Sequence, residues 1–184
     1  MKIAITGGIA EGKSTILQYI QEAGVETLSA DEIAKDILDQ QDAQEEVALK
    51  LNIELPIDRK KLLKLIAEDK KKRSILDQIM HPKILSVIKK SHISIVEVPL
   101  LYETNTEKYF DQVWVVTSGT KEQKKRLLKR LKDELLVDNL LKTQWPTEKK
   151  AARADKIINT NLPESCVKQE VLLALKEVGF DIRK

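Results

Sequence analysis

Residues 7–14 carry the feature that most constrains the fold, because they read Gly-Gly-Ile-Ala-Glu-Gly-Lys-Ser, with the spacing G-x-x-x-x-G-K-S. Glycines at this spacing let the backbone bend until successive amide groups converge on one point, and the lysine adds a positive charge beside them. The motif follows a short apolar run over residues 2–6 and opens a helical pattern over residues 13–22. A strand, this loop and a helix N-terminus in succession predict a nucleotide-phosphate site.

We expect the loop and the start of the helix to bind the phosphates. The expected binding residues are Gly8, Ile9, Ala10, Glu11, Gly12, Lys13, Ser14 and Thr15. The Ser14 hydroxyl is also the expected protein ligand of Mg²⁺. The alternative is a glycine-rich turn with an incidental lysine. A dinucleotide site of the G-x-G-x-x-G type is excluded because position 9 is isoleucine.

Apolar runs separated by turns predict five strands and several helices. The strands are expected at residues 2–6, 26–29, 93–98, 112–117 and 156–159, all rich in Val or Ile as buried parallel strands are. Helical patterns cover residues 13–22, 31–39, 43–51, 59–68, 79–90, 122–133 and 164–177. This alternation predicts an α/β fold with a sheet covered by helices on both faces.

The stretch between the second and third strands is unusually long for a crossover. Residues 35–90 are almost entirely helical in pattern, so an all-helical insert facing the phosphate loop is expected there. Asp58 precedes a helical run and is a candidate N-cap. The pair His81–Pro82 is expected to begin or interrupt a helix. The whole chain is expected to form one compact unit with a mobile cap.

Composition narrows the class of protein. Hydrophobic residues make up 42% and charged residues 33%, which is typical of a globular protein. One cysteine, Cys166, and two histidines exclude an intramolecular disulfide and the usual zinc patterns. No apolar run approaches the roughly 20 residues that span a bilayer, and the N-terminus lacks a signal-peptide pattern. We therefore expect a cytoplasmic protein without a membrane partner.

The basic residues do not by themselves indicate a nucleic-acid partner. The formal net charge is only +3, from 32 basic and 29 acidic residues. The basic stretches at residues 70–73 and 121–132 alternate with apolar residues at helical spacing, which favours solvated helix faces. Contact with a polyphosphate substrate is the functional alternative.

Two acidic residues, Asp31 and Glu97, lie at the ends of predicted strands, where their side chains can face the phosphate loop. Asp31 comes after the second strand, where ligands of open α/β sheets bind. Its carboxylate can accept a proton from an attacking hydroxyl or help to hold Mg²⁺, and the alternative is an N-cap for the next helix. Glu97 lies near the end of the apolar run over residues 93–98, where its position is compatible with a magnesium-linked acid or with a structural ion pair.

Arg126 and Arg130 lie one helical turn apart and therefore share a helix face. Guanidinium groups on this helix can close over the phosphates and stabilise a transferring phosphoryl group. The alternative is that both are surface cations among many lysines.

Several segments, taken in chain order, resemble the dephospho-CoA kinase family. They comprise residues 6–9 with 12–15, 30–34, 57–59 with Leu62, 81–84, 98–103, 123–130, Gln144 with 148–149, and 152–158. The phosphate loop is common to many families. The more specific segments are V-P-L-L-Y-E, H-P-K-I, A-D-E-I-A and A-D-K-I-I.

The resemblance implies an ATP-dependent kinase that phosphorylates the ribose 3′-hydroxyl of dephospho-CoA, the final step of coenzyme A synthesis. It implies a P-loop-type three-layer fold with a five-stranded parallel sheet, in a single domain at residues 1–184. The core would comprise residues 1–34, 91–120 and 154–184, with an acceptor-binding insert near 35–90 and a lid near 121–153. ATP and Mg²⁺ are the implied cofactors, and a monomer or weak homo-oligomer is expected.

The implied catalytic residues are Asp31 as general base, Lys13 and Arg130. Another small P-loop kinase, acting on a nucleoside monophosphate or a small alcohol, is the first alternative. An NTP-dependent switch without an acceptor is the second, although the N-K-x-D signature of GTPases is missing.

The chain departs from the family pattern inside the phosphate loop. Ala10 and Glu11 stand where the family has Gly and a small residue, Glu97 stands where it has Asp, and Thr160 where it has Asn. An acidic side chain at position 11 is compatible with bound phosphates if it points outward.

Overall fold

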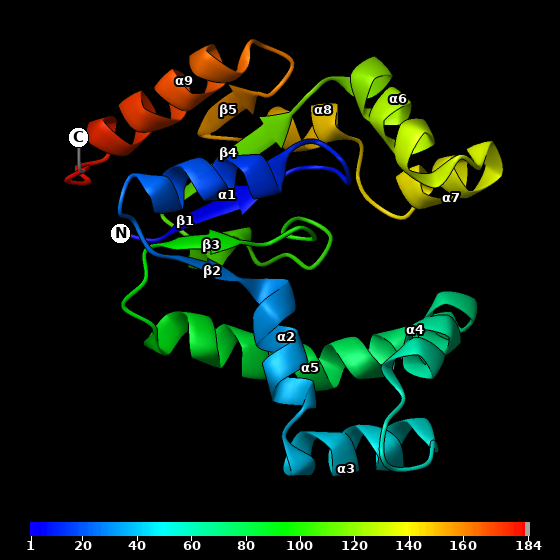
Figure 1. Cartoon of the computed structure of the whole chain (residues 1–184). Helices are drawn as coiled ribbons and strands as arrows, with labels where there is room; N and C mark the ends of the chain where they lie inside the picture. The colour runs from blue at the N-terminus through cyan, green and yellow to red at the C-terminus, as the bar shows by residue number, and fades with distance from the viewer. Residues whose placement is uncertain (183–184) are drawn as a thin grey trace. The chain divides into compact units, whose positions relative to one another are not determined.

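The computed structural model describes residues 1–182, apart from the side chain of Ala67, and divides into two compact units. The first unit comprises residues 1–28 together with the chain from residue 93 onward, and it contains most of the sheet (Figure 1). The second unit comprises Ser29–His92 and is helical. No helix within residues 1–182 combines the length and the apolar character needed to cross a membrane.

A five-stranded sheet forms the centre of the first unit. Its strands are β1 (Ile3–Thr6), β2 (Thr27–Ser29), β3 (Ile95–Glu97), β4 (Gln112–Thr117) and β5 (Lys156–Asn159), in the order β2-β3-β1-β4-β5. β1 pairs in parallel with β3 and β4, and β4 with β5. The prediction of a parallel five-stranded α/β sheet is confirmed, and the loop that follows β1 leaves the central strand at its carboxyl end.

Two helices cover one face of this sheet. They are α1 (Lys13–Glu22) and α9 (Glu164–Glu177), which pack against each other (Figure 1). Ile16 and Ile20 of α1 lie one turn apart and are fully buried with Trp114 of β4, as an amphipathic helix over a sheet requires. Trp114 is thus a core residue.

The opposite face of the sheet carries Thr6, whose hydroxyl donates to the carbonyl of Pro99 at 3.3 Å.

The remaining elements of the first unit are short. The loop after β3 contains a 3₁₀ turn, η1 (Glu107–Tyr109). The helix α8 (Thr147–Ala151) packs against β4. α6 (Thr120–Leu131) and α7 (Glu134–Lys142) pack together before α8. The sequence pattern predicts α6 within two residues but misses the shorter α7 and α8.

The second unit contains α2 (Ala30–Leu38), α3 (Gln41–Leu51), α4 (Arg59–Glu68) and α5 (Lys70–Lys90). The predicted cap of α4 is confirmed, because the Asp58 carboxylate accepts from the amides of Lys60 at 2.8 Å and Lys61 at 3.2 Å.

The expectation that His81–Pro82 would begin or interrupt a helix is wrong, because Pro82 lies inside the continuous helix α5. A proline removes one helical hydrogen bond to the residue four positions earlier. Ile79 and Ile88 on either side of Pro82 are buried, and this packing offsets the lost bond.

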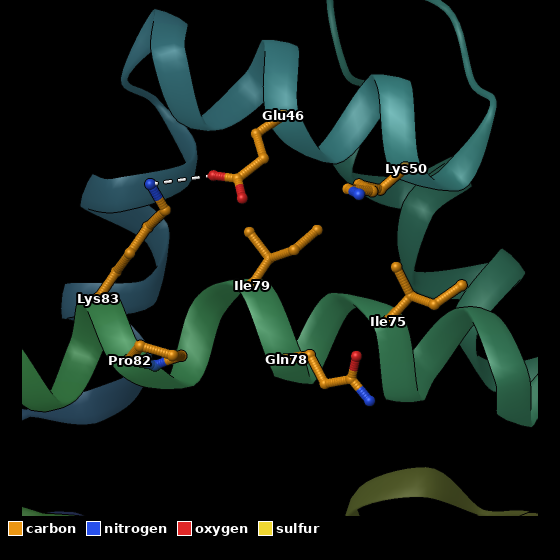
Figure 2. A pocket seen from close by; sticks show the side chains of 7 residues that line it. All are labelled: Glu46, Lys50, Ile75, Gln78, Ile79, Pro82 and Lys83. Atoms are coloured by element: carbon orange, nitrogen blue, oxygen red, sulfur yellow. Dashed lines mark ion pairs between the residues drawn. The ribbon is translucent and has the colours of Figure 1, made fainter.

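A pocket of about 470 Å³ lies between α3 and α5, wholly within the second unit (Figure 2). Ile75 and Ile79 of α5 provide its apolar wall, and Lys50 of α3 faces it. Lys83 Nζ lies 3.1 Å from Glu46 Oε2, so an ion pair joins the two helices at one end of the pocket.

Candidate active site

The phosphate loop joins the central strand β1 to α1, as predicted. The loop starts at Gly7, where a Cβ atom would lie 2.3 Å from the carbonyl oxygen of Val116 in β4. Only glycine allows so close an approach between the loop and the neighbouring strand. The loop is therefore fixed at its first residue against the sheet.

The N-terminus of α1 is open to an anion. Gly12 occupies the N-cap position without any side-chain cap, and the first turn contains no acidic residue. Ser14 and Thr15 in this turn are exposed. Since the first amide groups of a helix point out of its end and carry the positive end of the helix dipole, this terminus favours a phosphate.

Lys13 extends back across the loop. Its Nζ donates to the carbonyl of Gly7 at 3.1 Å and to that of Gly8 at 2.9 Å. The ammonium group is thus held at the loop, where a polyphosphate chain bound by the amides would meet it.

Glu11 does not point outward to solvent, contrary to the expectation for an acid in this loop. Its side chain is fully buried. One carboxylate oxygen, Oε2, accepts from the amide of Ser118 and from its hydroxyl at 2.8 Å. The other, Oε1, has no hydrogen-bonding partner in the described part of the chain. The acid is therefore tied to the junction of β4 and α6.

The two arginines of α6 differ in their contacts. Arg126 donates to the carbonyl of Thr160 at 2.9 Å and to its hydroxyl at 3.2 Å, and the Thr160 hydroxyl donates to the carbonyl of Glu11 at 2.7 Å. Arg126 thereby supports the loop after β5 and, through it, the phosphate loop. Arg130, one turn further along α6, is exposed, and its side chain makes no ion pair or hydrogen bond within residues 1–182.

Ser14 and Glu97 carry oxygen atoms of the kinds that Mg²⁺ binds. Glu97 ends β3 and pairs in register with Ile5 of β1, the strand that leads into the phosphate loop. Hydroxyl and carboxylate oxygens are the ligands that Mg²⁺ takes, with phosphate oxygens and water completing its octahedron. Within the described residues, no three His, Cys, Asp or Glu side chains cluster as a ready-made metal site. The residues present fit a metal held jointly by the protein and a nucleotide.

Asp31 lies in the first turn of α2 and is exposed. The alternative that it caps this helix is wrong, because the helix begins at Ala30 and Ser29 occupies the N-cap position. The Asp31 carboxylate therefore does not cap the N-terminus of α2. Asp31 belongs to the second unit, whereas the phosphate loop belongs to the first.

A buried ion pair near the loop was missed by sequence reasoning. Lys150 of α8 is fully buried, and its Nζ lies 2.9 Å from Glu103 Oε1 and 2.9 Å from the carbonyl of Pro99. Glu103 Oε1 also accepts from the amide of Trp145 at 2.7 Å. A lysine among three in residues 142–150 carries no sequence signal of burial, although Glu103 lies in a segment that carries the family resemblance.

Trp145 is half-buried in an aromatic and cationic cluster rather than in the sheet core. Its ring stacks on Tyr102 with centroids 5.9 Å apart, and Lys149 Nζ lies 3.6 Å from its centroid. The Tyr102 hydroxyl donates to the carbonyl of Arg153 at 2.9 Å. Burial raises the pKa of the Tyr102 phenol, so it remains a hydrogen-bond donor at neutral pH.

Two glutamines from segments that carry the family resemblance also reach the phosphate loop, although the resemblance assigned no role to either of them. Gln123 of α6 donates to the carbonyl of Ile9 at 3.0 Å. Gln144, which lies between α7 and α8, accepts from the amide of Ile9 at 3.1 Å. The segment from α6 to α8 therefore contacts the loop directly.

Comparisons with known proteins agree on one family. A family model described as dephospho-CoA kinase matches residues 1–164. A dephospho-CoA kinase of Fusobacterium nucleatum is 36% identical over 173 residues, which cover 88% of this chain and 90% of the relative. The solved dephospho-CoA kinase of Campylobacter jejuni is 28% identical with a TM-score of 0.71, covering 97% and 98% of the two chains. A solved protein of Thermus thermophilus, 22% identical with a TM-score of 0.85 and 98% coverage of both chains, shares the fold.

Proposed function

The chain belongs to the dephospho-CoA kinase family, and from this membership we propose that it transfers the γ-phosphoryl group of ATP to the ribose 3′-hydroxyl of dephospho-CoA, giving coenzyme A. The observation that carries the proposal is an intact phosphate loop, from Gly7 to Ser14, at the end of the central strand of a chain that matches the family over residues 1–164.

On the donor side, the amides of residues 8–14 would hold the β-phosphate and Lys13 would bridge the β- and γ-phosphates. The open N-terminus of α1 and the position of the Lys13 ammonium at the loop support this assignment. Phosphoryl transfer passes through a loose transition state, so fixed positive charge around the phosphates contributes more than covalent chemistry by the protein.

Ser14 and Glu97 would hold Mg²⁺ together with phosphate oxygens of ATP. When bound, the metal neutralises phosphate charge. The protein side of this site is the exposed Ser14 hydroxyl in the first turn of α1 and a carboxylate at the end of β3.

On the acceptor side, we propose that Asp31 orients the 3′-hydroxyl and accepts its proton. Its carboxylate is exposed and does not cap α2, which leaves it available for this role. The helices of the second unit would bind the rest of the acceptor. Proximity and orientation of the bound reactants would account for a large part of the rate.

Arg130 would close over the γ-phosphate when the α6–α8 segment acts as a lid. Its lack of an internal partner supports this role, since no ion pair within residues 1–182 has to be broken. Closure excludes water and so suppresses hydrolysis of ATP. We further propose that the enzyme acts in the cytoplasm as a monomer or weak homo-oligomer.

The experiment that tests this function is an ATP-dependent assay over a panel of acceptors. The panel contains dephospho-CoA, nucleoside monophosphates and small alcohols, with product detected by mass spectrometry. We expect efficient phosphorylation of dephospho-CoA at its ribose. Preference for another acceptor would assign the chain a different kinase activity, and nucleotide binding without any phosphorylated acceptor would refute the kinase proposal.

A further inference from the structure

Both main-chain groups of Ile9 in the phosphate loop are bound by side chains from the α6–α8 segment. Gln123 donates to the Ile9 carbonyl at 3.0 Å, and Gln144 accepts from the Ile9 amide at 3.1 Å. Gln123 is only 6% exposed, so its amide is committed to this contact rather than to water. The two contacts hold the peptide groups on either side of Ile9, which leaves the Ile9 backbone little freedom to rotate.

The residue after Ile9 has an unfavourable backbone conformation. Ala10 adopts φ 61°, in the left-handed region where its Cβ atom crowds the backbone. Glycine visits this region freely and alanine does not. Ala10 therefore needs its neighbours to hold it there.

The residue after Ala10 is anchored as well. The Glu11 carboxylate accepts from the amide and hydroxyl of Ser118, and its carbonyl accepts from Thr160 at 2.7 Å. Ala10 thus lies between two residues that are fixed by polar contacts, Ile9 on one side and Glu11 on the other.

The glutamine side chains pack directly on the loop. A Cβ atom on Gly8 would lie 2.3 Å from Gln123 Nε2 and 2.8 Å from the hydroxyl of Thr147 in α8. The absence of a side chain at Gly8 is therefore what allows Gln123 to reach the carbonyl of Ile9.

We propose that Gln123 and Gln144 are positioning residues that act through the main chain of Ile9 to hold Ala10 in its left-handed conformation, so that the loop is formed before the triphosphate binds. This inference rests on the proposed function only in taking ATP as the ligand. Since Gln144 lies in the connection between α7 and α8, the same contact makes the shape of the phosphate loop depend on the position of the lid.

The test is a set of methionine substitutions, which keep the length of glutamine but remove its hydrogen bonds. Gln144→Met and Gln123→Met are each made alone and together with Ala10→Gly, and the Kd for ATP is measured without acceptor. We call the contacts of Gln123 and Gln144 with Ile9 the clamp. With the clamp removed, Ala10 should populate the left-handed region only about a tenth of the time, so the Kd for ATP should rise about tenfold. Glycine populates it about half the time, so in the Ala10→Gly background the rise should be about twofold.

The matched control is Gln169→Met, on the exposed side of α9 and away from the loop, which should leave the Kd unchanged. At saturating ATP and acceptor, kcat of Gln144→Met should stay within about twofold of the unmodified enzyme, because a positioning residue changes how often the loop is competent. Equal losses of affinity in both backgrounds, or a fall in kcat with an unchanged KM for ATP, would overturn the inference.

Hydrogen exchange of the loop peptide without nucleotide separates this inference from the proposed function. Gln144→Met should speed exchange at residues 8–11, and Gln169→Met should not. Unchanged exchange in Gln144→Met would overturn the clamp whatever ATP does. Failure of the unmodified protein to bind ATP would instead overturn the proposed function, while the exchange result would still decide the clamp.

Discussion

Replacing Lys150 with methionine should be among the most destabilising substitutions outside the sheet core. Lys150 is 0% exposed, and its ammonium group lies 2.9 Å from both Glu103 Oε1 and the carbonyl of Pro99. Methionine fills a similar volume but leaves the Glu103 carboxylate without its cation, and Glu103 Oε2 has no hydrogen-bonding partner among the described residues.

The magnitude follows from the cost of an unpaired charge. Removing one member of a buried ion pair costs about 3–5 kcal/mol, because the remaining charge stays buried without compensation. For a chain of 184 residues, each kcal/mol lowers the Tm by about 2–4 °C, so the expected loss is on the order of 10 °C. Glu103→Gln should cost a similar amount, because it leaves the Lys150 ammonium buried without a carboxylate.

The double variant Lys150→Met with Glu103→Gln gives the decisive comparison. It removes both charges, while the glutamine oxygen can still accept from the amide of Trp145, which Glu103 now binds at 2.7 Å. We expect it to be more stable than either single variant in urea unfolding at pH 7. Single variants that each cost under about 1 kcal/mol, or a double variant whose loss equals their sum, would refute the account of a compensated buried pair.

Three further outcomes are expected. Asp31→Asn should lower kcat by about 10²–10⁴ with near-normal ATP binding by calorimetry, and full activity would remove Asp31 as the base. Lys13→Ala should abolish phosphoryl transfer in a discontinuous ATP assay, and retained turnover would exclude its role. The Thr120 hydroxyl donates to Glu148 and holds the pKa of that carboxyl below its ordinary value of 4.5. Because the pKa of Glu148 is lowered in the folded chain, the hydrogen bond stabilises the fold fully at pH values above 4.5. This stabilisation is lost as the pH falls through the lowered pKa. Thr120→Val should therefore reduce the free energy of unfolding at pH 7 by under about 1 kcal/mol and have a smaller effect at pH 3, both measured by urea titration, so an equal effect at both pH values would contradict the assignment.

The fold was largely predictable because its strands are short, apolar and bounded by turns. β4 and β5 lie at the predicted residues, and β1, β2 and β3 differ from prediction by at most two residues at an end. A buried parallel strand needs apolar side chains on both faces, so it can be recognised as a continuous apolar run without any knowledge of its neighbours.

Helices that depend on tertiary contacts were harder to predict. The short helix α8 buries two polar residues, Thr147 and Lys150, so its sequence lacks the apolar face that marks a packed helix. Pro82 suggests a helix end locally, yet α5 continues through it because Ile79 and Ile88 are buried on either side. In both cases packing against distant residues outweighs a local preference.

The candidate site also has one part that local sequence predicts and one part that depends on the fold. The phosphate loop is one continuous segment, so its spacing alone predicts a phosphate site. The contacts of Gln123 and Gln144 with Ile9 join residues more than a hundred positions apart. The family resemblance includes both glutamines, but their contacts with the loop become visible only when the fold brings α6 and the α7–α8 connection to it.

Glu11 shows why a departure from a family pattern needs the structure for its interpretation. Taken alone, an acid in a phosphate loop predicts repulsion of the ligand. In the folded chain the same carboxylate is buried and accepts from the amide and hydroxyl of Ser118, so its charge is directed to the β4–α6 junction. With Ala10 in a left-handed conformation beside it, the acid acts as an anchor for a loop with fewer glycines. The two unusual residues are therefore best understood as a pair: Ala10 makes the loop stiffer and strained, and Glu11 supplies one of the contacts that hold the strained conformation in place.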